Sequence, residues 1–131
     1  MPSVVVEVRR AYSEAEEVAI IEAVHAALVA AFRIPAGDKH VRLVVHEPHR
    51  FAVPPHLTDP GRATMVSIDC FAGRSVDAKR NLYAEIVGRL EPLGIPRDLV
   101  TILVRDLPAH SWGIRGGQAA CDVDLGFEVN I

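Results

Sequence analysis

Hydrophobic and polar positions follow two different spacings in the first third of the chain. Residues 4–8 form an apolar run of β type, and residues 41–45 form another. Between them, apolar side chains recur every three or four residues, at Val18, Ile21, Val24, Leu28 and Phe32. That spacing places side chains on one face of a helix, whereas short β-branched runs are typical of strands. The pattern predicts strand, helix, strand.

The predicted helix carries signals at both ends. Ser13 is followed three residues later by Glu16, the capping-box pattern in which each residue satisfies the other's backbone amide. Ile34-Pro35 ends the apolar stripe, and proline cannot continue a helix.

The same order of elements returns further along the chain. Residues 64–71 form a strand pattern, Ser75 is placed to cap a second helix, and residues 99–104 form a further strand, with Ile95-Pro96 before it. The apolar stripe of this second helix is Leu82, Ile86, Leu90 and Leu93. We therefore divide the chain into repeat units of about 2–46 and 64–106.

Two consecutive βαβ units define the expected fold class, which is α/β (α+β). Parallel strands joined by a helix share one sheet, and the crossover is almost always right-handed. The prediction is a four-stranded mixed sheet with both helices on one face. Because the other face would lack cover in a monomer, we expect oligomerisation to bury it.

The two units are joined by a proline- and histidine-rich segment, residues 47–61. It is too short for a domain linker, and we predict a surface loop or a short hairpin. His46, His49 and His56 have no regular ligand spacing and no neighbouring cysteine, so we interpret them as solvated loop histidines and predict no metal site.

The tail, residues 107–131, has a different pattern. Val123, Leu125, Phe127 and Val129 alternate with polar or small residues, which predicts a half-buried strand. Gly116-Gly117 lacks the phosphate-loop pattern. We interpret the tail as a segment that contacts a neighbouring subunit, and the whole chain, 1–131, as a single domain.

Composition narrows the classes of function. At 131 residues and 50% hydrophobic, the chain suits one folded domain, and its net charge of −3 disfavours a nucleic-acid binder. No apolar run approaches the roughly 20 residues of a membrane span, and a signal-peptide pattern is missing from the N-terminus. Cys70 and Cys121 are interpreted as reduced thiols. We expect a cytoplasmic protein that binds no nucleic acid or membrane and acts on small molecules or protein partners.

Met1 is followed directly by Pro2. The small second residue permits removal of Met1, which would leave proline with a free secondary amine. An α-amino group titrates at about pH 7.7–8.0 before any perturbation, so it can act as a base, an acid or a nucleophile. The alternative interpretation is a rigid proline at the start of an edge strand.

Several motifs together resemble the tautomerase superfamily, and most closely its malonate semialdehyde decarboxylase-like group, which is related to 4-oxalocrotonate tautomerase. They are Pro2 before a strand, Phe32-Arg33-Ile34-Pro35 with Asp38, Gly73-Arg74-Ser75, and Ser111-Trp112-Gly113 followed by Gly116-Gly117. The resemblance spans nearly the whole chain. It implies removal of Met1, cofactor-free chemistry at the terminal proline, and a homotrimer.

The resemblance also implies roles for individual residues. Pro2 would be the general base and acid, and Arg74 would bind the carboxylate of a small substrate through its planar fork. Asp38 would orient a water or assist proton handling, and Trp112 would line the pocket. Taken singly, Asp38 is also typical of a turn, Arg74 of a solvated helix start, and Trp112 of a core or interface.

The chain departs from the group at one motif. The decarboxylases carry an arginine pair in an R-x-R pattern, whereas Ala72 and Val76 flank Arg74 here at the two relevant positions. Arg42, Arg105 or Arg115 could supply the second charge. We therefore favour keto–enol tautomerisation of a 2-oxo acid such as phenylpyruvate. The alternatives are a malonate semialdehyde decarboxylase or hydratase, and a trimeric binding protein without turnover.

Overall fold

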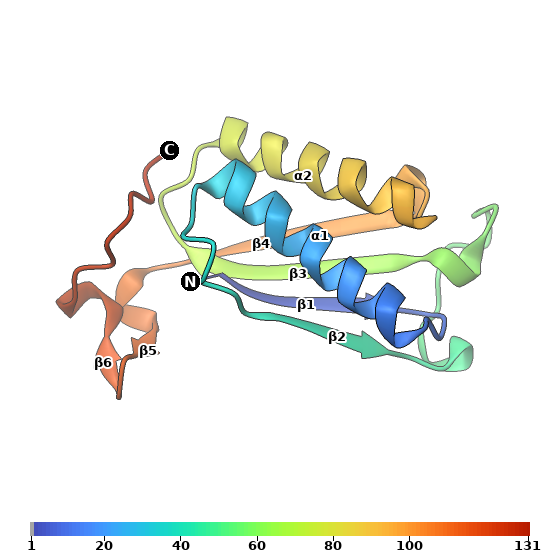
Figure 1. The fold of residues 1–131 in the computed structure, drawn as a ribbon, viewed down its shortest axis with the longest axis horizontal. Helices are drawn as coiled ribbons and strands as arrows, with labels where there is room; N and C mark the ends of the chain where they lie inside the picture. The colour runs from blue at the N-terminus through green and yellow to red at the C-terminus, as the bar shows by residue number, and fades with distance from the viewer. Residues whose placement is uncertain (1) are drawn as a thin grey trace.

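The structure is a computed structural model that describes residues 2–131, so the predicted removal of Met1 concerns a residue outside the described part of the chain. Two long helices cover one face of a sheet (Figure 1). The main elements are β1 (Ser3–Val8), α1 (Glu14–Phe32), β2 (Val41–Val45), β3 (Thr64–Phe71), α2 (Val76–Leu90), β4 (Val100–Leu107), and a small hairpin of β5 (Gly113–Ile114) and β6 (Gln118–Ala119).

The sheet has the predicted mixed topology. Its strand order is β2-β1-β3-β4. The outer pairs, β1 with β2 and β3 with β4, are parallel, and the central pair, β1 with β3, is antiparallel. The two βαβ units therefore meet along β1 and β3, and the predicted fold class is confirmed.

The core lies between the helices and the inner face of the sheet. Every second residue of β1, at Val4, Val6 and Val8, is almost fully buried, as are Val66 and Ile68 of β3. This is the period-2 alternation of a strand with one covered face. Apolar residues of both helices complete the core, including Ile20, Val24, Leu28, Phe32, Leu82, Ile86 and Leu90.

The capping box at the start of α1 forms as predicted. The Glu16 amide donates to Ser13 Oγ at 3.2 Å, and the Ser13 amide donates to Glu16 Oε1 at 3.0 Å. These hydrogen bonds lower the pKa of Glu16. The predicted inner face is only partly right, because Ile20 is buried whereas Val18 is 53% exposed. Apolar residues occur around much of α1, so their spacing alone does not define which side faces the sheet.

The second helix is shorter than its apolar stripe indicates. Ser75 caps it, with Oγ accepting from the Ala78 amide at 3.1 Å. However, α2 ends at Leu90 and continues as a 3₁₀ turn, Glu91–Leu93, that closes on Gly94 at a φ of 89°. Pro92 lies inside this turn and lacks the amide hydrogen that another helical residue would supply. Leu93 therefore packs against the core from the turn and not from the helix.

The segment between the units contains two 3₁₀ turns, Pro48–Arg50 and Pro60–Arg62, and no hairpin. His49 and His56 are exposed as predicted. The interpretation of His46 as solvated is wrong: it is half-buried, its Nε2 lies 3.0 Å from Glu7 Oε1, and its ring meets Phe51 edge to face. Within residues 2–131, no three His, Cys, Asp or Glu side chains are arranged to hold a metal ion.

The tail does not form the predicted strand at 123–129. The predicted alternation of burial is present, with Val123, Leu125, Phe127 and Val129 half-buried and the residues between them exposed. The segment runs back across its own chain (Figure 1), where Phe127 and Ile131 pack against the core and Ser75 Oγ donates to the Ile131 carbonyl at 2.9 Å. The apolar–polar alternation therefore correctly indicates half-buried side chains, but the segment does not pair with another strand within residues 2–131.

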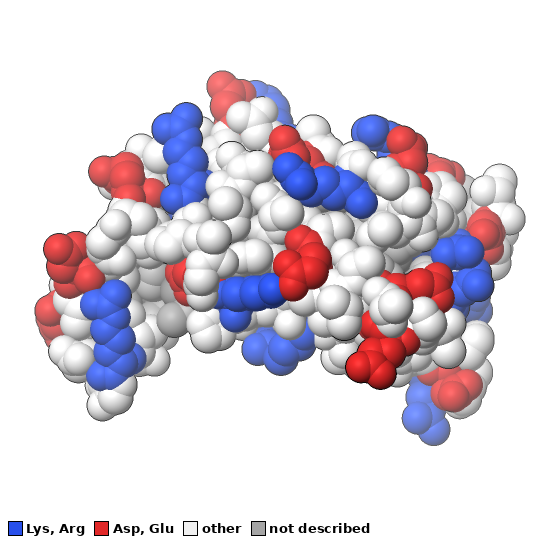
Figure 2. Space-filling model, viewed as in Figure 1, with Lys and Arg blue, Asp and Glu red and all other residues white. Residues whose placement is uncertain are grey.

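Two surface features bear on partners. No helix within residues 2–131 combines the length and apolar character needed to cross a bilayer. On the face shown in Figure 2, Lys and Arg side chains are interspersed with Asp and Glu, and no broad area of one sign is formed.

Candidate active site

Pro2 begins the central part of the sheet. It is buried, and the next residue, Ser3, pairs with Asp69 of β3. Continuing this antiparallel register by one residue places Pro2 beside Cys70. The Cys70 thiol is itself buried, and burial raises its pKa to about 11. The surroundings of Pro2 are therefore poorly solvated, an environment that disfavours the charged form of an amine.

The loop between α1 and β2 carries Asp38 to the same end of the sheet (Figure 1). Two hydrogen bonds position this loop. The Val4 amide donates to the His40 carbonyl at 2.9 Å, and buried His25 donates through Nε2 to the Ala36 carbonyl at 2.7 Å. The Asp38 amide also donates to the Pro35 carbonyl at 3.0 Å, which closes a turn. The Asp38 carboxylate is 18% exposed and lies 3.9 Å from His40 Nε2.

Arg74 is buried, although it immediately precedes the N-cap of α2. Only 6% of the residue is exposed, and the guanidinium lies 4.8 Å from the centre of the Phe32 ring. Nη1 donates to the Phe71 carbonyl at 3.1 Å, whereas Nε and Nη2 are buried with no hydrogen-bond partner among the described residues. The interpretation of Arg74 as a solvated helix-start residue is therefore wrong.

The charge of Arg74 is affected by its surroundings in two ways. Burial lowers the pKa of the guanidinium, and the nearby acidic groups, Asp38 among them, act in the opposite direction. Even so, an arginine remains charged at neutral pH. Two unpaired N–H groups on a buried cation form a ready donor pair for an anionic oxygen.

Trp112 and Arg74 both contact Phe71. Its ring meets Phe71 edge to face, with centroids 5.1 Å apart, and Phe71 also supplies the carbonyl that Arg74 binds. The Trp112 Nε1 atom is buried and has no partner within residues 2–131. The structure thus gathers Asp38, Arg74 and Trp112 at the end of the sheet where Pro2 directly precedes β1.

A cavity of about 320 Å³ opens next to this group. Asp38 lines it together with Pro35 and Gly37 from the α1–β2 loop, Ile114 and Arg115 from the hairpin, and Leu125 and Phe127 from the tail. Sequence reasoning did not place Arg115 or the two tail residues here. The sequence named Arg115 only as one of three arginines that could supply a second charge, and the apolar alternation of the tail gave no indication of what the tail contacts.

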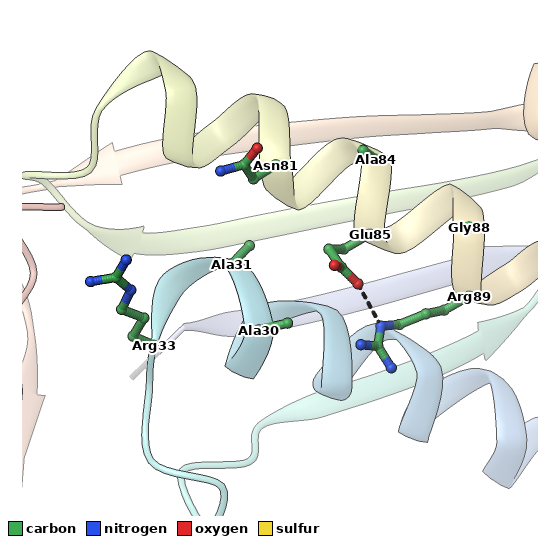
Figure 3. A pocket seen from close by; sticks show the side chains of 8 residues that line it. All are labelled: Ala30, Ala31, Arg33, Asn81, Ala84, Glu85, Gly88 and Arg89. Carbon is green, nitrogen blue, oxygen red and sulfur yellow. Dashed lines mark hydrogen bonds and ion pairs between the residues drawn. The ribbon is translucent and has the colours of Figure 1, made fainter.

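A larger groove of about 570 Å³ runs between α1 and α2. Figure 3 shows that its lining combines small residues such as Ala30 and Gly88 with polar ones, and that Glu85 and Arg89 pair across one turn of α2. Pro2, Asp38, Arg74 and Trp112 are not part of this lining. The lining of the groove is the more polar of the two, with Arg33, Asn81, Glu85 and Arg89. Of the four predicted residues, however, Asp38 lines the smaller cavity and none lines the groove, so we place the candidate site at the smaller cavity.

Comparisons with known proteins agree with this architecture. Residues 38–115 match the model of a family described as "Tautomerase enzyme", and the chain belongs to that family. The malonate semialdehyde decarboxylase FG41, in a crystal structure inhibited by 3-bromopropiolate, is 27% identical. The match covers 89% of this chain and 92% of that one, with a TM-score of 0.79.

Two further structures share the fold. A malonate semialdehyde decarboxylase whose structure addresses decarboxylase and hydratase activities is 22% identical, with coverage of 93% and 99% and a TM-score of 0.81. Native fused 4-OT is 21% identical, with coverage of 92% and 98% and a TM-score of 0.82. The predicted membership of the tautomerase superfamily, in its malonate semialdehyde decarboxylase-like group, is confirmed.

Proposed function

We propose that the chain is a cofactor-free tautomerase that interconverts the enol and keto forms of a small 2-oxo carboxylic acid. The nitrogen of Pro2 acts as general base and acid once Met1 has been removed. The observation that carries this proposal is the buried Arg74 guanidinium with two unpaired nitrogens, which interacts electrostatically with Asp38 at the end of the sheet where Pro2 precedes β1.

The reaction needs one proton to be taken up and one to be delivered. The Pro2 nitrogen accepts the proton of the enol hydroxyl, and the O–H electron pair becomes part of the new carbonyl. Pro2 then delivers the same proton to the far carbon of the carbon–carbon double bond, whose electron pair forms the new C–H bond, and the amine returns to its neutral form. Burial disfavours the charged form of such an amine, which favours the neutral form that can act as a base.

Arg74 and Asp38 have complementary roles in this scheme. Arg74 donates to the anionic oxygens of the substrate through Nε and Nη2, which stabilises the charge that develops as the enol loses its proton. Asp38 assists proton handling beside it. Trp112 packs edge to face on Phe71, whose carbonyl accepts from Arg74, so Trp112 supports the position of Arg74.

Decarboxylation is the second candidate, because a malonate semialdehyde decarboxylase is 27% identical to this chain. It would require cations that hold a carboxylate in the orientation for loss. The neighbouring side chain at the start of α2, Val76, is apolar and 63% exposed, so it supplies no such charge. Tautomerisation requires fewer cations than decarboxylation, and Arg74 supplies one.

The ultraviolet decay of enol-phenylpyruvate tests the proposal, with intact mass used to verify that the protein begins at Pro2. We expect ketonisation well above the buffer rate. Release of CO₂ from malonate semialdehyde without ketonisation would instead support the decarboxylase. If the protein catalyses neither reaction, the result would support a trimeric binding protein without turnover.

We also propose that residues 1–131 act as one domain within a homotrimer. Support comes from the sheet face opposite the helices, where Leu103 is 42% exposed and Val44 is 41% exposed. Two structures of fused 4-OT with this fold are described as trimers. In this arrangement the tail, residues 107–131, would contact a neighbouring subunit in addition to its own.

Leu103→Glu is expected to dissociate this trimer, because it places a charge where apolar surface would be buried. Light scattering after gel filtration should give three times the chain mass of 14.2 kDa for the wild type and a single chain mass for the variant. Val18→Glu is a matched control, since Val18 is 53% exposed on α1, on the helix side. A monomeric wild type, or a variant that stays trimeric, would contradict the proposal.

A further inference from the structure

The turn of the β5–β6 hairpin holds a charged residue in a conformation that favours glycine. Arg115 has a φ of 49°, and it is followed by Gly116 and Gly117 at φ values of 83° and 93°. A left-handed backbone is unfavourable for a long side chain and is tolerated best by glycine, asparagine and aspartate. Such a conformation persists where the surrounding structure fixes it, and the tight turn between β5 and β6 does so here, which holds Arg115 in one place.

The turn directs Arg115 to the cavity that Asp38 lines. The guanidinium is anchored by a hydrogen bond from Nη1 to the Asp124 carbonyl at 2.9 Å. The remainder of the cavity wall is largely apolar, with Ile114, Leu125 and Phe127 contributing to it. One side of the cavity therefore offers a cation, and the adjoining wall suits a hydrocarbon group.

Two other arginines near the start of β1 are engaged elsewhere. Arg105 binds both oxygens of Asp69, at 2.6 Å and 3.1 Å. Arg42 donates to Ser3 Oγ at 3.2 Å. Neither lines the cavity, whereas Arg115 does.

We propose that Arg115 is a specificity-determining residue that binds the carboxylate of an apolar monocarboxylate in this cavity. The carboxylate binds the Arg115 guanidinium, and the hydrocarbon part of the ligand packs on Leu125 and Phe127, which line the same cavity. This inference rests on the proposed function, which locates the active site at this cavity. It adds the substrate class, which is acids with a compact apolar group.

The test is a binding measurement that requires no turnover. The probes are 3-phenylpropionate and its neutral analogue 3-phenylpropionamide, titrated against the fluorescence of Trp112, which is the single tryptophan of the chain. The variants are Arg115→Asn, since asparagine tolerates the left-handed backbone, and Arg115→Lys, which keeps the charge without the planar fork. Arg97→Gln, at the far end of the sheet, removes one positive charge outside the cavity.

We expect the wild type and Arg97→Gln to bind the acid more tightly than the amide. Arg115→Asn should weaken binding of the acid by about 10- to 100-fold, the range for a charge-assisted hydrogen-bonded pair, with little change for the amide. The affinity of Arg115→Lys for the acid should lie between that of the wild type and that of Arg115→Asn. Thermal unfolding of each variant verifies that the fold is kept.

Unchanged affinity of Arg115→Asn for the acid would overturn the inference, as would a wild type that binds neither probe or does not distinguish them. The proposed function is judged separately by enol-phenylpyruvate decay. Selective binding lost in Arg115→Asn would support the carboxylate site even in a protein without tautomerase activity. Turnover with unchanged binding in Arg115→Asn would remove Arg115 from an otherwise valid mechanism.

Discussion

Pro2→Ala is expected to lower kcat/KM for enol-phenylpyruvate by about 100-fold or more, which lies within the range for loss of a positioned general base. Alanine leaves a primary amine that is no longer held by the pyrrolidine ring. The reacting nitrogen therefore loses its fixed orientation at the start of β1. Ultraviolet decay of the enol measures the effect directly.

Two controls accompany this substitution. Intact mass must show that wild type and variant both begin at residue 2, since alanine also permits removal of Met1. Pro60→Ala serves as the matched control, because Pro60 starts a 3₁₀ turn in the segment between the two units. An unchanged rate in Pro2→Ala would rule out the terminal nitrogen as the catalytic group.

Arg74→Met is expected to separate activity from stability. Loss of the donors that face developing negative charge should reduce kcat by about 100- to 1,000-fold. Removal of a buried cation with two unpaired nitrogens should leave the free energy of unfolding unchanged or raise it, because an unsatisfied polar group is costly to bury. The loss of one hydrogen bond to the Phe71 carbonyl acts against this gain.

Enzyme assays and urea unfolding of the same preparations measure both effects. Arg80→Met is the control, since Arg80 is exposed on α2 and pairs with Asp77 at 2.8 Å. Arg74→Lys should show intermediate activity, because it keeps the charge and loses the fork. A strongly destabilised Arg74→Met that retained full activity would show that Arg74 is a structural residue only.

The helices and strands could be predicted because each has a characteristic pattern of apolar and polar residues within its own segment. Residues 41–45 coincide with β2 and residues 64–71 with β3, because both are short segments rich in β-branched and other apolar residues. The second helix, α2, shows that such patterns do not fix where an element ends. Its stripe extends to Leu93, yet the helix ends at Leu90, because Pro92 changes the hydrogen bonding after it.

The candidate site was less accessible to sequence reasoning. Met-Pro alone favours a rigid proline at the start of a strand, and Pro2 becomes a catalytic candidate only together with the other motifs. An arginine beside a helix start resembles a solvated one, and the buried Arg74 packs on Phe32 from the other unit. Arg115 reaches the cavity only because the tail returns to bring Leu125 and Phe127 opposite the α1–β2 loop. Contacts between segments far apart in the chain leave no local pattern.

The most direct test of the mechanism changes the terminal nitrogen and no side chain. Protein that begins at Pro2 is compared with the same chain carrying Gly-Ser before Pro2, which converts the amine to an amide without basicity. Intact mass identifies each form, and enol-phenylpyruvate decay gives the rates. The mechanism predicts rapid ketonisation by the first form and only the buffer rate for the second. Equal ketonisation by both forms would contradict catalysis by the Pro2 amine.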